Sequence, residues 1–259
     1  MPRIVKNFLK KHLLRDLPAK QVRRWVDREL GANTVLGGPF RNMKYNNWTR
    51  LSGLAKASAY YPKLLGTYEI EIVPFIQRIA ELGMRRIIVV GAGEGYYAVG
   101  FARLLNAQVV AFEAQGTEAL LELAALNGVS SHVSARTICD AAGLRAEVDG
   151  RYRTCVFMDI EGGESILLDP LIVPGLSAAW MIVEVHDCFI PGITLLLRRR
   201  FELSHRIQEV WSRPRCPEDF PLQYRAKWFD PSMYYLEYMG ERPVTTSWLY
   251  MEPINQEKD

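Results

Sequence analysis

The chain has 259 residues, of which 49% are hydrophobic and 24% charged, which excludes a disordered chain and leaves room for a sizeable core. No apolar run is long enough to cross a bilayer and the N-terminus lacks a secretory pattern, so we expect a cytoplasmic protein without a membrane span. The four cysteines are widely spaced, which argues against a zinc cluster or a disulfide framework.

The charge is distributed unevenly along the chain. Residues 1–60 hold 13 Lys and Arg against 3 Asp and Glu, so the net charge of +3 separates into +10 there and −7 over the remaining residues. We interpret residues 1–66 as a basic N-terminal extension, with helices expected within 3–30. Its basic residues either form a solvated helical face or contact an anionic partner.

From residue 67 onward, helical and strand patterns alternate. A helix is expected from Thr67, as its N-cap, to about Leu82. The alternation that follows predicts an α/β fold, a doubly wound, mostly parallel, seven-stranded Rossmann-like sheet in a domain spanning 67–259. The expected strands are 85–90, 108–113, 132–138, 154–159, 178–185, 205–211 and 233–239, and the expected helices are 95–105, 117–126, 140–146, 163–169 and 191–201.

The stretch VVGAGEGYYAVG (89–100) joins the first of these strands to a helix, where a doubly wound sheet binds nucleotides. Its glycines are Gly91, Gly93 and Gly95. A dinucleotide fingerprint needs a third glycine at the position of Tyr96, and Glu94 would be unfavourable beside a pyrophosphate. Glu113 ends the next strand, where a carboxylate can accept hydrogen bonds from ribose hydroxyls.

Acidic residues also follow the fourth and fifth expected strands. The segments are VFMDIEGGE (156–164) and IVEVHD (182–187). Ligands of open parallel sheets bind beyond the carboxyl ends of the strands, so these side chains should lie at the same edge as the glycine loop. The residues concerned are Asp159, Glu161, Glu164, Glu184, His186 and Asp187.

These motifs resemble those of class I S-adenosylmethionine-dependent methyltransferases. VVGAGEGYY looks like their first motif, and D-I-E-G-G-E followed by V-E-V-H is similar to FkbM-type methyltransferases over roughly residues 67–190. The resemblance implies S-adenosyl-L-methionine as the cofactor. It also implies that Asp140 meets the adenine, although Asp140 could equally cap a helix. The cofactor site would comprise Gly91, Gly93, Glu94, Gly95, Tyr96, Glu113, Ala114, Asp140 and Asp159.

Methyl transfer requires an aligned acceptor and removal of the acceptor's proton. His186 is the natural general base, because its ordinary pKa lies near neutrality, and we expect Asp159 and Glu184 to complete the catalytic group. Alternatively, Asp159, Glu184 and Asp187 hold a divalent cation such as Mg²⁺ that lowers the pKa of an acceptor hydroxyl. Each acidic residue could instead stabilise the N-terminus of the following helix.

The resemblance favours transfer to oxygen on a small molecule, such as a sugar or a natural product. Two other classes stay open: an NAD-dependent oxidoreductase, and a non-catalytic binding module on the methyltransferase fold. A nucleic-acid acceptor is disfavoured, because the sequence lacks the N/D-P-P-Y/F motif common in amino-directed nucleic-acid enzymes. The sequence leaves a homo-oligomer open.

Overall fold

The computed structural model describes residues 33–45, 60–213, 217–219 and 246–254. The chain divides into two compact units, residues 1–68 with 214–242 and residues 69–213 with 243–259. The predicted boundary between residues 66 and 67 stays a prediction. The helices expected within 3–30 and the strand expected at 233–239 lie outside the described residues.

The described part of the first unit holds short elements. Helix α3 (Tyr61–Leu65) ends at Gly66, which has a left-handed backbone. The 3-10 helix η5 (Pro217–Asp219) belongs to the same unit. Thr34 and Lys44 form an isolated antiparallel bridge.

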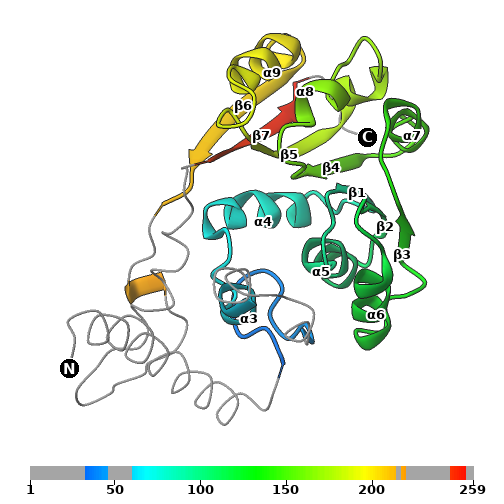
Figure 1. Cartoon of the computed structure of the whole chain (residues 1–259), viewed down its shortest axis with the longest axis vertical. Helices are drawn as coiled ribbons and strands as arrows, with labels where there is room; N and C mark the ends of the chain where they lie inside the picture. Colours follow the sequence, from blue (N-terminus) through cyan, green and yellow to red (C-terminus); the bar gives the residue numbers. More distant parts are fainter. Residues whose placement is uncertain (1–32, 46–59, 214–216, 220–245, 255–259) are drawn as a thin grey trace, which may run out of the picture. The chain divides into compact units, whose positions relative to one another are not determined.

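The second unit is built around one seven-stranded sheet with the order β3-β2-β1-β4-β5-β7-β6 (Figure 1). Strand β7 is antiparallel to both of its neighbours, and the other paired strands are parallel. The chain order reverses at the β1/β4 junction, which is where open α/β sheets bind ligands. The predicted doubly wound, mostly parallel sheet is therefore confirmed. The strands are β1 (Arg86–Val90), β2 (Gln108–Phe112), β3 (Val133–Arg136), β4 (Thr154–Met158), β5 (Trp180–Val185), β6 (His205–Trp211) and β7 (Ser247–Pro253).

Helices cover both faces of this sheet (Figure 1). On one face, apolar residues of α7, α8 and α9 share a core with the alternate strand residues Ile88, Val156 and Met181. On the other face, Phe101 of α5 packs edge-on against Phe157 of β4, with ring centroids 5.8 Å apart. The helices are η3 (Ile70–Ile72), α4 (Val73–Glu81), α5 (Tyr96–Leu105), α6 (Glu118–Leu126), α7 (Ala141–Glu147), α8 (Glu164–Leu167), η4 (Pro174–Ala178) and α9 (Ile193–Phe201).

Strand β7 is not among the strands predicted from the sequence. Its residues Trp248 to Met251 are buried without alternation, because the strand lies between β5 and β6 and is covered on both faces. A short continuous apolar run of this kind does not distinguish a strand from a buried helix by its period.

The expected helix start at Thr67 is wrong. The Thr67 amide donates to the carbonyl of Pro62, and Glu69 has a left-handed backbone with φ 46°. Helix α4 begins only at Val73, after η3, and Pro74 lies in its first turn. Proline suits that position because its missing N–H would have had no helical partner there.

Within the described residues, no helix has both the length and the apolar character that a membrane span requires. Cys139, Cys155 and Cys188 are free thiols. The cytoplasmic location stays a prediction.

Candidate functional site

The glycine loop between β1 and α5 is held tightly by its neighbours. The amides of Gly91 and Ala92 both donate to the carbonyl of Phe112, at 3.0 and 2.9 Å. Gly91 has φ +80°, and a Cβ there would lie 1.8 Å from the carbonyl oxygen of Asp159. Only glycine fits this position, so β1 can approach the end of β4 closely.

Glu113 connects the end of β2 to the same loop. Its Oε2 accepts a hydrogen bond from the Gly93 amide at 2.6 Å, and its Oε1 accepts one from the Gln115 amide at 2.8 Å. Gly93 borders open space, since no atom lies within 4 Å of where its Cβ would be. An ionised carboxylate can accept about four hydrogen bonds, so Glu113 retains capacity for ligand hydroxyls.

The two tyrosines after the loop pack into the domain. Tyr96 is 4% exposed and meets Tyr97 edge-on, with ring centroids 5.3 Å apart. Burial raises the pKa of Tyr96, so its hydroxyl stays protonated. The ring centroids of Tyr97 and Phe157 are 4.2 Å apart, and the Tyr97 hydroxyl donates a hydrogen bond to the Glu69 carboxylate. Both tyrosines therefore anchor the start of α5, and the cofactor contact of Tyr96 stays a prediction.

Asp140 caps helix α7. Its Oδ1 accepts the Gly143 amide at 2.7 Å, which is the helix-capping alternative considered for this residue. The cofactor contacts predicted for Asp140, Glu94 and Ala114 stay predictions.

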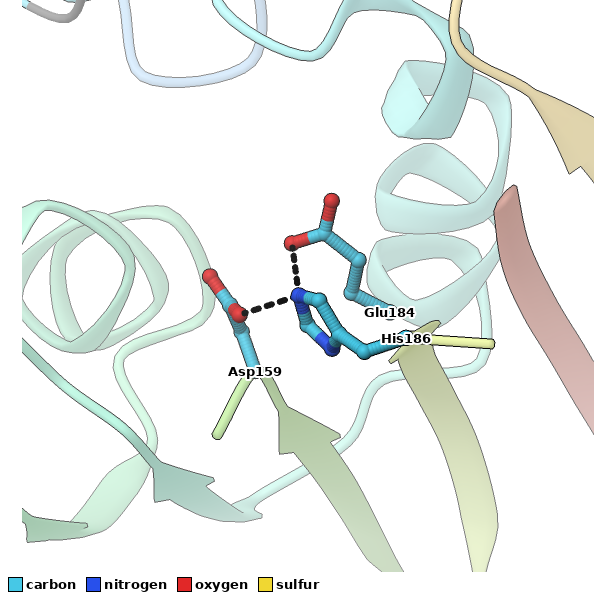
Figure 2. A group of neighbouring side chains, drawn as sticks. All are labelled: Asp159, Glu184 and His186. Carbon is cyan, nitrogen blue, oxygen red and sulfur yellow. Dashed lines mark ion pairs between the residues drawn. The ribbon is translucent and has the colours of Figure 1, made fainter. Parts of the chain in front are cut away.

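A carboxylate–imidazole cluster lies beyond the adjacent ends of β4 and β5. Asp159 directly follows β4. Glu184 is the penultimate residue of β5, and His186 directly follows β5. Figure 2 shows the Asp159 and Glu184 carboxylates converging on His186. Its Nε2 lies 3.7 Å from Asp159 Oδ1 and 3.6 Å from Glu184 Oε2. One ligand atom from each residue lies within 4.8 Å of the others.

Two further residues, Glu164 and Thr246, contact members of this cluster and orient them. The Glu164 carboxylate lies 2.9 Å from Nδ1 of His186, and the hydroxyl of Thr246 donates to Glu184 Oε1 at 2.7 Å. Burial by itself lowers the pKa of His186. The hydrogen bond to Glu164 and the nearby carboxylates, Glu184 foremost, outweigh burial and raise the pKa above its ordinary value.

Asp187 lies outside the group formed by Asp159, Glu184 and His186, and its metal-binding role stays a prediction. Its Oδ1 accepts the Gly192 amide at 2.9 Å and its Oδ2 accepts the Thr194 amide at 3.2 Å. Asp187 thus satisfies amides at the N-terminus of α9, where the helix dipole favours a negative charge. Among the described residues, the set that could hold a metal ion is Asp159, Glu184 and His186.

The chemistry of this donor set fits a divalent cation. Two carboxylate oxygens and one imidazole nitrogen are ligands that Mn²⁺, Fe²⁺ or Zn²⁺ accept readily, whereas Mg²⁺ prefers oxygen alone. The imidazole makes a first-row transition metal a better match than the expected Mg²⁺. The Nδ1 atom of His186 is bonded to the Glu164 carboxylate, so Nε2 is the atom oriented to bind a metal ion.

No family model matches the sequence, and no curated protein does. Solved structures with a similar fold include methyltransferases. The O-methyltransferase TomG from Streptomyces achromogenes, solved with S-adenosylmethionine, is 14% identical, with 81% of this chain and 92% of that chain covered and a TM-score of 0.46. Sp1610 of Streptococcus pneumoniae, solved with S-adenosyl-L-methionine, is 11% identical, with coverages of 72% and 75% and a TM-score of 0.43.

Sequence reasoning did not assign roles to Glu164 or Thr246. Glu164 had a signal, because the third acidic residue of D-I-E-G-G-E falls in the first turn of α8 and can face back toward the strand end. Thr246 had none, because its contact with Glu184 spans 62 residues of sequence.

Proposed function

We propose that this chain is an S-adenosylmethionine-dependent methyltransferase that transfers the methyl group to an oxygen of a small-molecule acceptor, such as a sugar or a natural product. The observation that carries the proposal is the convergence of two groups at one edge of the sheet. Glu113, bonded to the glycine loop, lies at the end of β2, and the cluster around His186 lies at the ends of β4 and β5. The reversal of strand order falls between them.

The glycine loop and Glu113 would hold the cofactor. The backbone at Gly93 borders open space, and Glu113 keeps acceptor capacity for ribose hydroxyls, as described above. When bound, the cofactor supplies an electrophilic methyl group on a sulfonium. This proposed site requires no third glycine at Tyr96, because no pyrophosphate has to be accommodated.

His186 would remove the proton of the acceptor hydroxyl. Its Nε2 makes no hydrogen bond to any described residue, so this atom is available to a ligand, whereas Nδ1 is occupied by Glu164. After proton transfer, the imidazolium would lie beside the Asp159 and Glu184 carboxylates, which stabilise the positive charge. The proton would pass from the acceptor oxygen to Nε2 as the oxygen forms its bond to the methyl carbon and the bond from that carbon to the sulfonium sulfur breaks, which leaves S-adenosylhomocysteine as the second product.

The same cluster favours a metal-assisted variant of this function. Asp159, Glu184 and His186 would hold the cation, which when bound lowers the pKa of an acceptor hydroxyl. Calorimetric titration of chelator-treated protein with Mn²⁺, Zn²⁺ and Mg²⁺ separates the two variants. Binding that Asp159→Asn abolishes supports the metal, and absence of binding leaves His186 acting as the base.

Calorimetry with S-adenosylhomocysteine and with NAD tests the cofactor assignment. We expect S-adenosylhomocysteine to bind and NAD not to bind, and the opposite result would overturn the proposal in favour of an oxidoreductase. Transfer of a ¹³C-labelled methyl group to candidate acceptors, followed by NMR, then distinguishes O-methyl from N-methyl products. His186→Gln should abolish turnover while leaving S-adenosylhomocysteine binding within about twofold. A non-catalytic module would show no turnover with any acceptor in the wild type.

A further inference from the structure

Glu164 is a buried acidic side chain that the proposed reaction does not yet use. It is 0% exposed and lies in the first turn of the four-residue helix α8. Within the described ranges, His186 is the one basic side chain that it contacts. A buried carboxylate costs free energy unless hydrogen bonds and an opposite charge compensate it, so its retention beside His186 calls for a reason.

The hydrogen bonds of Glu164 define which nitrogen of His186 carries the proton. Glu164 Oε1 lies 2.9 Å from Nδ1 of His186 and 3.3 Å from the Ile160 amide, which can only donate. Because an ionised carboxylate has no proton to donate, Oε1 accepts on both sides and the Nδ1 atom that faces it is the donor. In a neutral imidazole, a proton on Nδ1 leaves the lone pair on Nε2.

The surrounding backbone keeps Glu164 in this place. The turn between Asp159 and α8 passes through Glu161 and Gly162, both with left-handed backbones, at φ 57° and 109°. This sharp turn brings α8 back toward the strand ends, so that Glu164 can bond the amide of Ile160 in the same turn. The acceptor atom is thus fixed by main chain on one side and by the imidazole on the other.

We propose that Glu164 is a positioning residue, whose carboxylate holds the proton of neutral His186 on Nδ1 and so turns the lone pair of Nε2 toward Asp159 and Glu184. The effect of Glu164 on catalysis rests on the proposed function. The position of the proton on His186 does not depend on that function. The same orientation serves His186 as a general base and as a metal ligand, because each role needs an unprotonated Nε2.

The competing explanation is that Glu164 only completes the packing around α8. Glu164→Gln and Glu164→Leu separate the two explanations. The glutamine carbonyl can replace Oε1 as the acceptor for both the Ile160 amide and Nδ1, whereas leucine fills similar space without any acceptor. Glu161→Gln is a matched control, since it removes an exposed carboxylate from the same turn whose charge also raises the pKa of His186 but which makes no hydrogen bond to the imidazole.

The ¹⁵N chemical shifts of His186 give the test. They are measured in full-length protein labelled with ¹⁵N-histidine, at a pH at which the imidazole is neutral, and are assigned with His186→Gln. We expect Nδ1 protonated and Nε2 unprotonated in the wild type, in Glu164→Gln and in Glu161→Gln. In Glu164→Leu the proton should redistribute toward Nε2. We also expect Glu164→Leu to lower kcat by about 10- to 100-fold with little change in KM for the cofactor, and Glu164→Gln to recover most of that loss.

Two results would overturn the inference: a wild-type His186 with its proton on Nε2, or a folded Glu164→Leu whose proton stays on Nδ1. Circular dichroism establishes folding, and if the leucine variant does not fold, the wild-type spectrum decides alone. Failure of the proposed function is seen separately, as an absence of S-adenosylhomocysteine binding by a protein whose His186 spectrum is as expected.

Discussion

Replacing Gly91 by alanine should destabilise the protein more than any other single change in the glycine loop. A Cβ at Gly91 would lie 1.8 Å from the Asp159 carbonyl oxygen and 2.8 Å from its carbon, both of which are backbone atoms that no rotamer change can move away. The left-handed backbone, at φ +80°, adds about 1–2 kcal/mol of strain for a residue with a side chain. Overpacking adds about 1–3 kcal/mol, so we expect a total loss of about 2–5 kcal/mol.

Gly93→Ala is the matched control for this prediction. Gly93 also has a left-handed backbone, at φ +54°, but nothing lies within 4 Å of where its Cβ would be, so it should lose only the strain of about 1–2 kcal/mol. Urea denaturation followed by circular dichroism measures both losses, provided that the slope of the transition is unchanged. If Gly91→Ala proved as stable as Gly93→Ala, the close approach of β1 to the end of β4 would be refuted as the reason for glycine.

Three further changes probe the site. Glu113→Gln replaces one of two acceptor oxygens that bind loop amides, and should weaken S-adenosylhomocysteine binding by about tenfold in calorimetry; an unchanged affinity would remove Glu113 from the cofactor site. Burial lowers the pKa of His186, but its carboxylate neighbours outweigh burial and raise this pKa above the ordinary 6.5. Because the general base acts in its neutral form, kcat should rise with pH as His186 loses its proton, at a pH above 6.5. The stability that the imidazolium contributes should be complete below pH 6.5 and be lost as pH rises through the raised pKa, a loss that urea titrations of His186→Gln should not show. Asp187→Ala should cost about 1 kcal/mol of stability through the lost helix-terminal bonds, yet leave metal binding unchanged in the same titration in which Asp159→Asn abolishes it.

A strand could be predicted where its own residues form a recognisable apolar pattern. Strands β1, β4 and β5 are runs of buried apolar residues, because helices cover both of their faces, and such runs stand out in a sequence. Strand β7 is as deeply buried, but its partners β5 and β6 are set by tertiary contacts. The late start of α4 has a local signal in Pro74, because proline suits the first turn of a helix.

The cluster could be predicted because topology alone brings its members together. Parallel strands end at one edge, so residues that directly follow β4 and β5 are neighbours however far apart they lie in sequence. Within that edge the choice between adjacent residues depended on local hydrogen bonds. His186 and Asp187 are consecutive, yet one faces the cluster and the other caps α9, and no periodicity distinguishes them.

The antiparallel direction of β7 is part of the construction of the site. Glu184 of β5 pairs with Trp248 of β7, and since the two strands run in opposite directions, β7 begins at the edge where β5 ends. Thr246, immediately before β7, therefore reaches Glu184 and donates its hydroxyl to Oε1, while the other carboxylate oxygen faces His186. A parallel strand in this place would present its carboxyl end there and would deliver a different part of the chain. The orientation of Glu184 thus depends on the last strand of the sheet, just as the orientation of His186 depends on the first turn of α8.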